Sequence, residues 1–182
     1  MTTATAATED VVLRCGSVVA IRAVEPTDAE LLLDGFARLS LRSRYWRFLT
    51  AKRELTPAEV RFFTHVDHYD HDALAAVDPG SGRGIGVARF VRSDTDAQQA
   101  EVAVTVVDGW QRCGVGTALV TRLAVRALRV GVFSFTATVA DNNEAMIGLL
   151  RNGHPGVELT SVDGNLLEYE IALTSFAGRR AG

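Results

Sequence analysis

The hydrophobic positions of residues 101–130 change their spacing at a glycine-rich turn. Residues 102–107, VAVTVV, form a β-branched run whose alternation is typical of a strand. Asp108-Gly109 ends this run, and residues 118–130 then repeat Leu, Ala and Val at the spacing of one helix face. The pattern predicts a strand, a turn and a helix in immediate succession.

Other segments show the same two periods, so strands and helices are expected along the whole chain. Capping boxes beside a proline predict helices that begin near Thr27, with Glu30, and at Thr56, with Glu59. Turn residues separate short apolar runs that predict strands. A hairpin is expected over 14–22, strands over 73–77, 85–91, 133–139, 155–162 and 166–173, and a further helix over 142–152.

The turn before the helix at 118–130 suits an anion. The first N–H groups of a helix lack partners within it and lie at the positive end of its dipole, so phosphate oxygens can accept hydrogen bonds from them. Gly114 and Gly116 let an anion approach the backbone, and Arg112 adds a positive charge. Because Thr117 replaces the lysine of a P-loop and the third glycine of a dinucleotide fingerprint is missing, another kind of phosphate loop is expected.

The sequence Gln111-Arg112-x-Gly114-x-Gly116-Thr117 after a strand of valines resembles the pyrophosphate loop of the GNAT superfamily of acyl-CoA-dependent N-acetyltransferases. The order of predicted elements over residues 12–172 is similar to the GNAT fold. Residues 13–32, 39–49, 54–60, 65–77 and 100–119 resemble the acetyltransferase domain of Pat-type bacterial protein lysine acetyltransferases. The resemblance implies an α/β (α+β) fold with a mixed central sheet of about six to seven strands flanked by helices.

The same resemblance implies roles for individual positions. Glu101 falls on the catalytic glutamate, and Asn143, in Asn-x-x-Met, on an asparagine that touches the CoA arm. Acetyl-CoA is the implied co-substrate, without a metal, and a protein such as an acyl-CoA synthetase is the implied acceptor. Strand backbone groups that would hold the pantetheine arm and polarise the thioester are those of Val104, Thr105 and Val106. The residues that would cradle the pyrophosphate are Gln111, Arg112, Cys113, Gly114, Val115, Gly116 and Thr117.

Acetylation of a lysine requires a base in any family. A lysine amine with a pKa of about 10.4 is neutral in roughly one molecule in 2,500 at pH 7, so its deprotonation costs about 4–5 kcal/mol. Glu101 is the only carboxylate in the strand part of the segment and is suited to accept this proton, directly or through water. Many GNAT enzymes protonate the leaving thiolate with a tyrosine, but Leu149 and Leu150 stand at that place. Either CoA leaves without that acid or another group, such as His154, serves.

Composition and charge are ordinary for a soluble globular protein. The 182 residues are 47% hydrophobic and 23% charged, with a net charge of −3. Scattered basic residues indicate no nucleic-acid partner, the lack of a long apolar run indicates no membrane, and two distant cysteines without a signal peptide indicate the cytoplasm. We expect a disordered lead-in over 1–10, one N-acetyltransferase domain over 11–174 and a loose tail over 175–182. Monomer and homodimer both stay open.

Four patterns have other interpretations. Arginines and aromatics interleave at 39–49, which suits single-stranded nucleic acid, although packing onto the sheet fits a short segment of an acidic chain better. Glycines at 82–86 resemble a phosphate loop but join two strands. Histidines and aspartates, which are metal-ligand types, crowd residues 65–72. Cys113 has the position of a reactive thiol at a helix N-terminus but no base partner in the sequence.

Two further functions stay open beside lysine acetylation. One is acetyl transfer to a small amine such as a polyamine, an amino acid or an aminoglycoside. The other is a non-catalytic acyl-CoA sensor that kept the loop and lost turnover. A broad, acid-lined acceptor groove would favour a protein lysine, and a narrow, closed one a metabolite.

Overall fold

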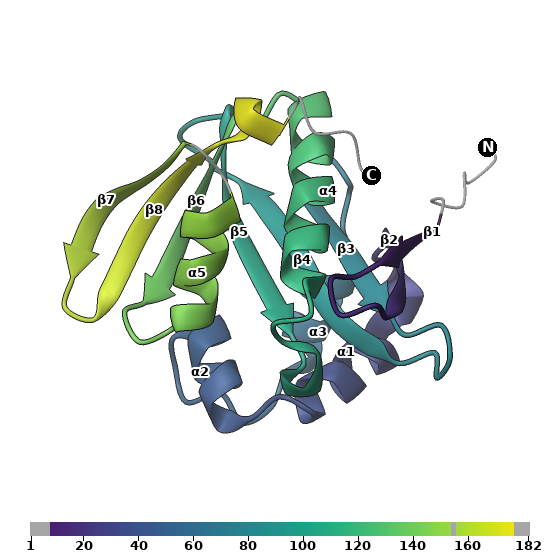
Figure 1. Ribbon diagram of the computed structural model, residues 1–182. Coiled ribbons are helices and arrows are strands. Elements are labelled where there is room, and N and C mark those ends of the chain that lie inside the picture. Colours follow the sequence, from purple (N-terminus) through teal and green to yellow (C-terminus); the bar gives the residue numbers. More distant parts are fainter. Residues whose placement is uncertain (1–7, 154–155, 177–182) are drawn as a thin grey trace.

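The computed structural model describes residues 8–153 and 156–176, whose strands form one eight-stranded sheet in the order β1-β2-β3-β4-β5-β6-β8-β7 (Figure 1). Neighbouring strands are antiparallel except β5 and β6, which are parallel. The sheet exceeds the expected strand count because β1 pairs with β2. The strands are β1 (Glu9–Val12), β2 (Val18–Ala23), β3 (His71–Val77), β4 (Gly84–Arg92), β5 (Gln99–Val106), β6 (Ser134–Ala140), β7 (Val157–Asp163) and β8 (Leu166–Ala172).

Helices cover both faces of this sheet (Figure 1). Helix α4 packs on β3, β4 and β5 on one face, and α5 lies beside it. On the other face α1 packs on β4 and α2 on β5, with α3 next to α1. The helices are α1 (Ala29–Ala37), α2 (Leu41–Phe48), α3 (Pro57–Thr64), α4 (Val115–Arg129) and α5 (Glu144–Gly153), and the 3-10 turns are η1 (Pro26–Asp28), η2 (Asp108–Trp110) and η3 (Leu173–Phe176).

The main hydrophobic core lies between the sheet and α4. Phe90 of β4 and Leu119 of α4 are fully buried in it. Gly86 allows α4 to approach β4 closely, because a Cβ atom at this position would lie 3.0 Å from Cγ1 of Val115 and 3.1 Å from the carbonyl oxygen of Thr105. The close packing of α4 therefore accounts for the glycine at this position, and no phosphate-binding role is needed to explain it.

Strands β5 and β6 separate soon after they pair. Their parallel register covers only Gln99 to Glu101 on β5, opposite Ser134 to Thr136 on β6. Strand β5 continues to Val106, paired with β4 along its other side. The two strands diverge toward the end of the molecule at which α2 lies (Figure 1). Within the described ranges, the last residues of β5 consequently have no strand partner on the β6 side.

The start of α1 differs from the prediction. The capping box expected from Thr27 and Glu30 is wrong, because Glu25 and Asp28 form the box at the 3-10 turn that precedes the helix. The Glu25 N–H donates to the Asp28 carboxylate at 2.8 Å. Arg22 of β2 donates to both oxygens of the same carboxylate, at 2.7 and 2.6 Å. This ion pair holds the Asp28 carboxylate in the position from which it caps the Glu25 N–H.

The segment between α1 and α3 forms a helix of its own, α2, that the sequence pattern did not predict. Ser40 caps this helix. Phe48 near its end packs against Phe63 of α3, with 6.2 Å between the ring centroids, which supports the packing interpretation of the arginine- and aromatic-rich segment. At the start of α3, the predicted capping box of Thr56 and Glu59 is confirmed.

Regular structure extends into both predicted ends. Strand β1 begins at Glu9, inside the expected lead-in over 1–10, and the Glu9 carboxylate pairs with Arg122 of α4 at 2.6 Å. The 3-10 turn η3 reaches Phe176, inside the tail expected over 175–182. Residues 1–7, 154–155 and 177–182, and with them the candidate acid His154, lie outside the described residues.

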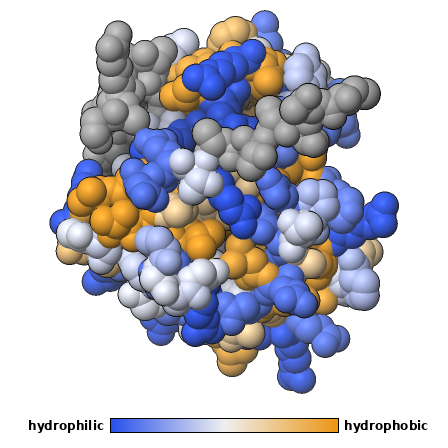
Figure 2. All heavy atoms as spheres, turned by 90° about the vertical axis from the view of Figure 1, so that its right-hand side faces the viewer, coloured by the Kyte–Doolittle hydropathy of each residue, from blue (hydrophilic) through white to orange (hydrophobic). Residues whose placement is uncertain are grey.

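The described helices are all too short or too polar to cross a bilayer. Figure 2 shows the side of the molecule at which β1 and β2 lie, where hydrophobic side chains gather in separate groups among hydrophilic ones.

Candidate active site

A groove of about 330 Å³ opens where β5 and β6 separate. Its walls come from β5, the turn before α4, the first residues of α4 and α5, and α2. Among the positions to which the resemblance gives a role, the groove brings together Val104, Thr105, Val106, Gln111, Arg112, Gly114, Gly116, Thr117 and Asn143. It adds residues that the sequence did not connect with a cofactor: Arg14, Ser43, Trp46, Arg47, Trp110, Ala145, Met146 and Gly148.

Six consecutive backbone N–H groups, those of residues 112–117, have no hydrogen-bond acceptor within the described part of the chain. The next N–H group, of Ala118, donates to the carbonyl of Gly114 at 3.0 Å and so begins the helical bonding. The turn curls because Arg112 and Gly114 adopt left-handed backbone conformations, with φ of 63° and 97°. Successive free N–H groups at a helix N-terminus form an anion-binding site.

Gln111 supports this turn with its side chain. Its Nε2 donates to the Ser43 hydroxyl at 3.2 Å, to the Val106 carbonyl at 3.1 Å and to the Asp108 carboxylate at 3.2 Å. Its backbone N–H donates to the Asp108 carbonyl at 3.3 Å. The donors of Gln111 are therefore used by protein groups. The residue holds the loop in place and does not itself offer a donor to a ligand.

Two of the loop residues expected to cradle a pyrophosphate lie outside the groove lining. The side chain of Val115 is buried in the core, where it holds α4 against β4. Cys113 meets Cys15 of the β1–β2 turn, so the structure brings together two thiols that are distant in the sequence. A hydrogen bond between them lowers the pKa of Cys15 and raises that of Cys113. A raised pKa makes Cys113 a poor nucleophile.

Asn143 lies in the groove wall at the start of α5. Its Oδ1 accepts from the N–H of Met146 at 3.1 Å, while its Nδ2 has no acceptor among the described residues. The neighbouring Asn142 accepts from the Trp46 indole at 2.8 Å, which draws α2 across to the start of α5. Leu149 completes the wall with an apolar side chain.

Glu101 is exposed on β5 and lines neither the groove nor the cavity beside it. Its side chain points to the face opposite the buried Val102, since neighbouring residues alternate across a strand. About 10 Å of extended strand separate it from Val104. Burial lowers the pKa of Arg47 in α2, and the negative charge of Glu101 opposes this effect, which places the two charges near each other.

Comparison with known proteins identifies the family. A model of the acetyltransferase (GNAT) family matches residues 38–154. The chain belongs to this family. It is 38% identical over 134 residues to Acetyltransferase Pat of Mycolicibacterium smegmatis, covering 74% of this chain and 40% of that protein. The GNAT chain thus spans less than half of this mycobacterial relative's length.

Two further relatives agree with this assignment. Identity to an acetyltransferase of Pseudomonas aeruginosa is 29% over 133 residues, covering 72% of this chain and 71% of that protein. The structure is similar to the GNAT domain of S. lividans PAT, with a TM-score of 0.84 and 31% identity over 91% of this chain and 96% of that chain. The predicted resemblance and fold class are confirmed, with more strands than expected.

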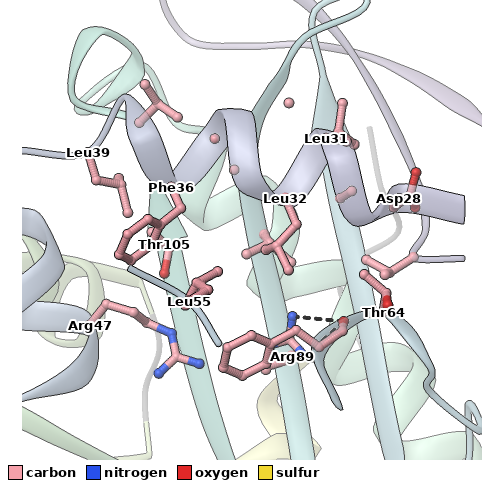
Figure 3. Close-up of a pocket in the computed structure, with 18 of the residues that line it drawn as sticks. Asp28, Leu31, Leu32, Phe36, Leu39, Arg47, Leu55, Thr64, Arg89 and Thr105 are labelled. Atoms are coloured by element: carbon pink, nitrogen blue, oxygen red, sulfur yellow. Dashed lines mark hydrogen bonds between the residues drawn. The ribbon is translucent and has the colours of Figure 1, made fainter. Parts of the chain in front are cut away.

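A second cavity of this GNAT chain, of about 80 Å³, lies between α1 and the sheet (Figure 3). It adjoins the groove, because Arg47 and Thr105 line both. Arg89 of β4 is 4% exposed and donates twice to the Phe63 carbonyl at 3.2 Å and once to Nε2 of His71 at 3.0 Å. Burial and, to a smaller extent, the charge of Arg47 lower the pKa of Arg89 to about 9.

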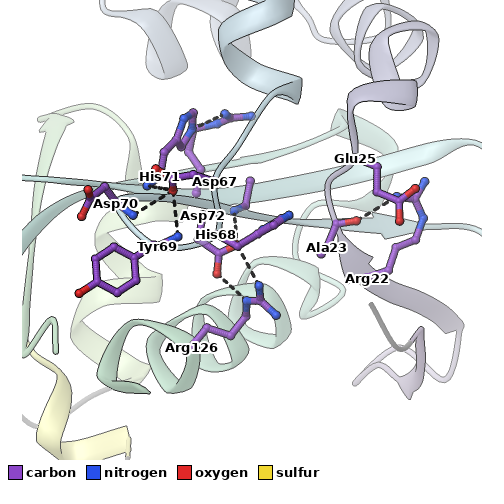
Figure 4. Close-up of polar contacts among 12 residues, drawn as sticks. Arg22, Ala23, Glu25, Asp67, His68, Tyr69, Asp70, His71, Asp72 and Arg126 are labelled. Atoms are coloured by element: carbon purple, nitrogen blue, oxygen red, sulfur yellow. Dashed lines mark hydrogen bonds and ion pairs between the residues drawn. The ribbon is translucent and has the colours of Figure 1, made fainter. Parts of the chain in front are cut away.

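The polar residues at 65–72 are bonded to protein groups (Figure 4). One oxygen of Asp67 accepts three successive backbone N–H groups of the loop, each at 2.9 Å. Asp72 is buried, accepts from Arg126 of α4 at 2.5 Å and lies 2.8 Å from Nδ1 of His68. In the described ranges no three histidines, cysteines or acidic residues are placed to hold a metal ion. These contacts attach the loop before β3 to α4.

Proposed function

We propose that this chain transfers an acetyl group from acetyl-CoA to a primary amine, and that this amine is a lysine side chain of a protein such as an acyl-CoA synthetase. The observation that carries the proposal is the row of six N–H groups at 112–117 beside the groove that find no acceptor in the described part of the chain, since such a row suits a pyrophosphate. The similarity to Acetyltransferase Pat supports acetyl transfer, and the resemblance to Pat-type protein lysine acetyltransferases implies the lysine acceptor.

The rest of the groove suits the remainder of the co-substrate. Strand β5 leaves the backbone of Val104–Val106 without a strand partner on the β6 side, where the amide groups of a pantetheine arm would bind. Asn143 supplies its Nδ2 as a further donor from the opposite wall. The thioester carbonyl would then lie against β5, at the junction marked by Thr105 and Arg47.

The reaction forms a C–N bond and breaks a C–S bond. The amine nitrogen attacks the thioester carbon, and collapse of the tetrahedral intermediate expels CoA as a thiolate. A lysine that arrives as an ammonium loses two protons: one ends on the CoA sulfur and the other in solvent. Glu101 acts as the general base and accepts the proton of the attacking amine, directly or through water. Leu149 offers no hydroxyl, so we propose that water protonates the thiolate.

A small-molecule amine is a second candidate acceptor. The cavity beside the groove is narrow and carries two arginines in an apolar lining, whereas a site for the positively charged lysine of a folded protein is expected to be broad and acidic. An amine that also bears a negative group matches this lining better than a polyamine does.

Calorimetric titration with acetyl-CoA, together with transfer of labelled acetyl groups to an acyl-CoA synthetase, polyamines and amino acids, tests the proposal. Label on a synthetase lysine supports the first acceptor, and label on a small amine supports the second. Binding without any transfer would favour the sensor, and absence of binding would overturn the proposal. Gly114→Val, which forces a side chain into a left-handed conformation, should weaken binding. Gly109→Val, in open space in the same turn, is the control.

A further inference from the structure

We infer that the cavity between α1 and the sheet binds a carboxylate that extends from the acyl-transfer site and is held by Arg47 and Arg89. The inference rests on the proposed function, because the carboxylate belongs to one of the two reacting molecules. Figure 3 shows both arginines below α1, where Arg47 extends toward Arg89.

Neither arginine has an acidic partner among the residues that the structure describes. Arg47 forms no hydrogen bond or ion pair within the described residues, and its guanidinium lies 4.9 Å from the Phe48 ring centroid and 5.6 Å from that of Phe63. Arg89 approaches the same Phe63 ring at 4.5 Å and bonds only to neutral groups. Two positive charges thus share one aromatic ring without a counter-ion.

The acid that lines the cavity is already neutralised. Asp28 lies in the wall, and Arg22 holds both of its oxygens. Glu101 attracts Arg47 only from a distance, without an ion pair. A desolvated, uncompensated charge is costly, and an anion that pairs with it removes part of the cost. The cavity therefore favours an anionic ligand over a neutral or cationic one.

Donor geometry and size narrow this anion to a carboxylate on a short chain. A guanidinium presents two parallel N–H groups that match the two oxygens of a carboxylate. The Thr105 hydroxyl has no partner among the described residues and adds a donor at the mouth of the cavity. A volume of about 80 Å³ accepts on the order of six water-sized groups, which suits a carboxylate with two or three methylenes.

Two reacting molecules supply such a group at this position. One is an acyl-CoA whose acyl chain ends in a carboxylate, as in succinyl-CoA. The other is an acceptor amine with its own carboxylate on a short chain, as in 4-aminobutanoate. Both would pass Arg47 and Thr105, which line the groove and the cavity alike.

Matched pairs of ligands distinguish these two sources. Calorimetry compares succinyl-CoA with butyryl-CoA, which has the same chain length and no charge at its end. Transfer from acetyl-CoA compares 4-aminobutanoate with butylamine, which has the same number of carbon atoms and no carboxylate. We expect one pair to show a preference for the carboxylate of about tenfold or more.

Arg47→Gln should remove this preference, and Arg47→Lys should retain part of it. For each protein we compare the ratio of the two affinities, or of the two transfer rates, within a ligand pair. A general loss of binding or activity affects both members of a pair and cancels from the ratio. Arg61→Gln removes an equal charge from an exposed position on α3 and should leave the ratios unchanged. If Arg47→Gln does not fold, Arg89→Lys is the second variant, because it keeps the buried charge but loses the two parallel N–H groups of the guanidinium.

Failure of the inference is separable from failure of the proposed function. If acetyl-CoA binds and is used, but neither pair shows a preference or Arg47→Gln retains it, the carboxylate site is overturned and acetyl transfer stands. If no acyl-CoA binds, titration of the wild type and of Arg47→Gln with free succinate still decides: binding that depends on Arg47 supports the site, and its absence overturns it.

Discussion

The hydroxyl of Ser43 in α2 donates to the carboxylate of Asp108, in the turn after β5, across 2.5 Å. The backbone N–H of Ser40 donates to the other oxygen of Asp108 at 2.6 Å. Burial alone would raise the pKa of Asp108, but these hydrogen bonds hold it below its ordinary value. Asp108 therefore fastens the N-terminus of α2 to the turn that carries the free N–H groups.

Replacement of this carboxylate should weaken CoA binding at a distance from the ligand. In Asp108→Ala the buried Ser43 hydroxyl loses its acceptor and the Gln111 amide loses one of its three, so the unfolding free energy should fall by about 1–3 kcal/mol. The dissociation constant for acetyl-CoA should rise about tenfold as the turn loosens. Calorimetry and urea unfolding measure both effects. Asp94→Ala, in an exposed loop, is the control, and an unchanged dissociation constant would show that the turn holds its shape alone.

Gly86→Ala should displace the start of α4. The added methyl group would lie 3.0 Å from Val115 and 3.1 Å from the Thr105 carbonyl, and backbone cannot yield as a flexible side chain does. We expect a loss of about 1–3 kcal/mol in the free energy of unfolding, with weaker acetyl-CoA binding because the loop N–H groups move with α4. Gly109→Ala, which meets no atom within 4 Å, should leave both quantities unchanged. Full stability of Gly86→Ala would contradict the close packing.

Glu101→Gln should lower kcat by roughly 10²- to 10⁴-fold, the usual contribution of a general base, with little change in acetyl-CoA affinity. The measurement is the rate of labelled transfer at several pH values. Glu54→Gln, another exposed glutamate, is the matched control. Equal rates for variant and wild type at every pH would remove Glu101 from the mechanism.

Local sequence patterns predicted the strand, turn and helix at the groove, because alternating valines and two glycines act within a few residues of each other. They failed at the start of α1, where both Thr27 with Glu30 and Glu25 with Asp28 have the spacing of a capping box. An ion pair between Asp28 and Arg22, six residues earlier at the end of β2, selects the second. Both pairs have the same spacing, so the sequence pattern alone does not choose between them.

The acceptor side of the site could not be predicted, because its two arginines come from segments far apart in the sequence. Arg47 lies on a helix and Arg89 on a strand far along the sequence, and both meet only when α2 and α3 pack on the sheet. Each arginine alone resembles an ordinary surface cation. Their meeting around Phe63, in a nearly acid-free cavity, is a property of the tertiary structure.

Acidification should destabilise the fold through His71. Burial, and then the charge of Arg89, lower the pKa of His71 to about 4 from 6.5. Between these two values the unfolded chain binds a proton that the folded protein excludes, so stability is lost as the pH falls through this range. After allowance for partial exposure, the expected loss is roughly 2 kcal/mol.

Urea unfolding at several pH values between 4 and 7 measures this dependence. In His71→Gln the amide can still accept from Arg89 but does not titrate, so the slope should become shallower. His65→Gln, at the exposed end of α3, is the control and should keep the wild-type slope. Identical slopes for all three proteins would assign the acid sensitivity to other groups.

The early separation of β5 and β6 also concerns association between molecules. Most sheets expose their unpaired backbone groups along an outer edge, where a second chain can add a strand and start aggregation. Here a stretch of unpaired strand lies in the interior of the sheet, between α2, α4 and α5. A long, thin ligand can enter that space, but a neighbouring β-sheet cannot. The unpaired backbone groups of β5 therefore stay accessible to a ligand, while a strand of a second molecule is kept from pairing with them and starting polymerisation.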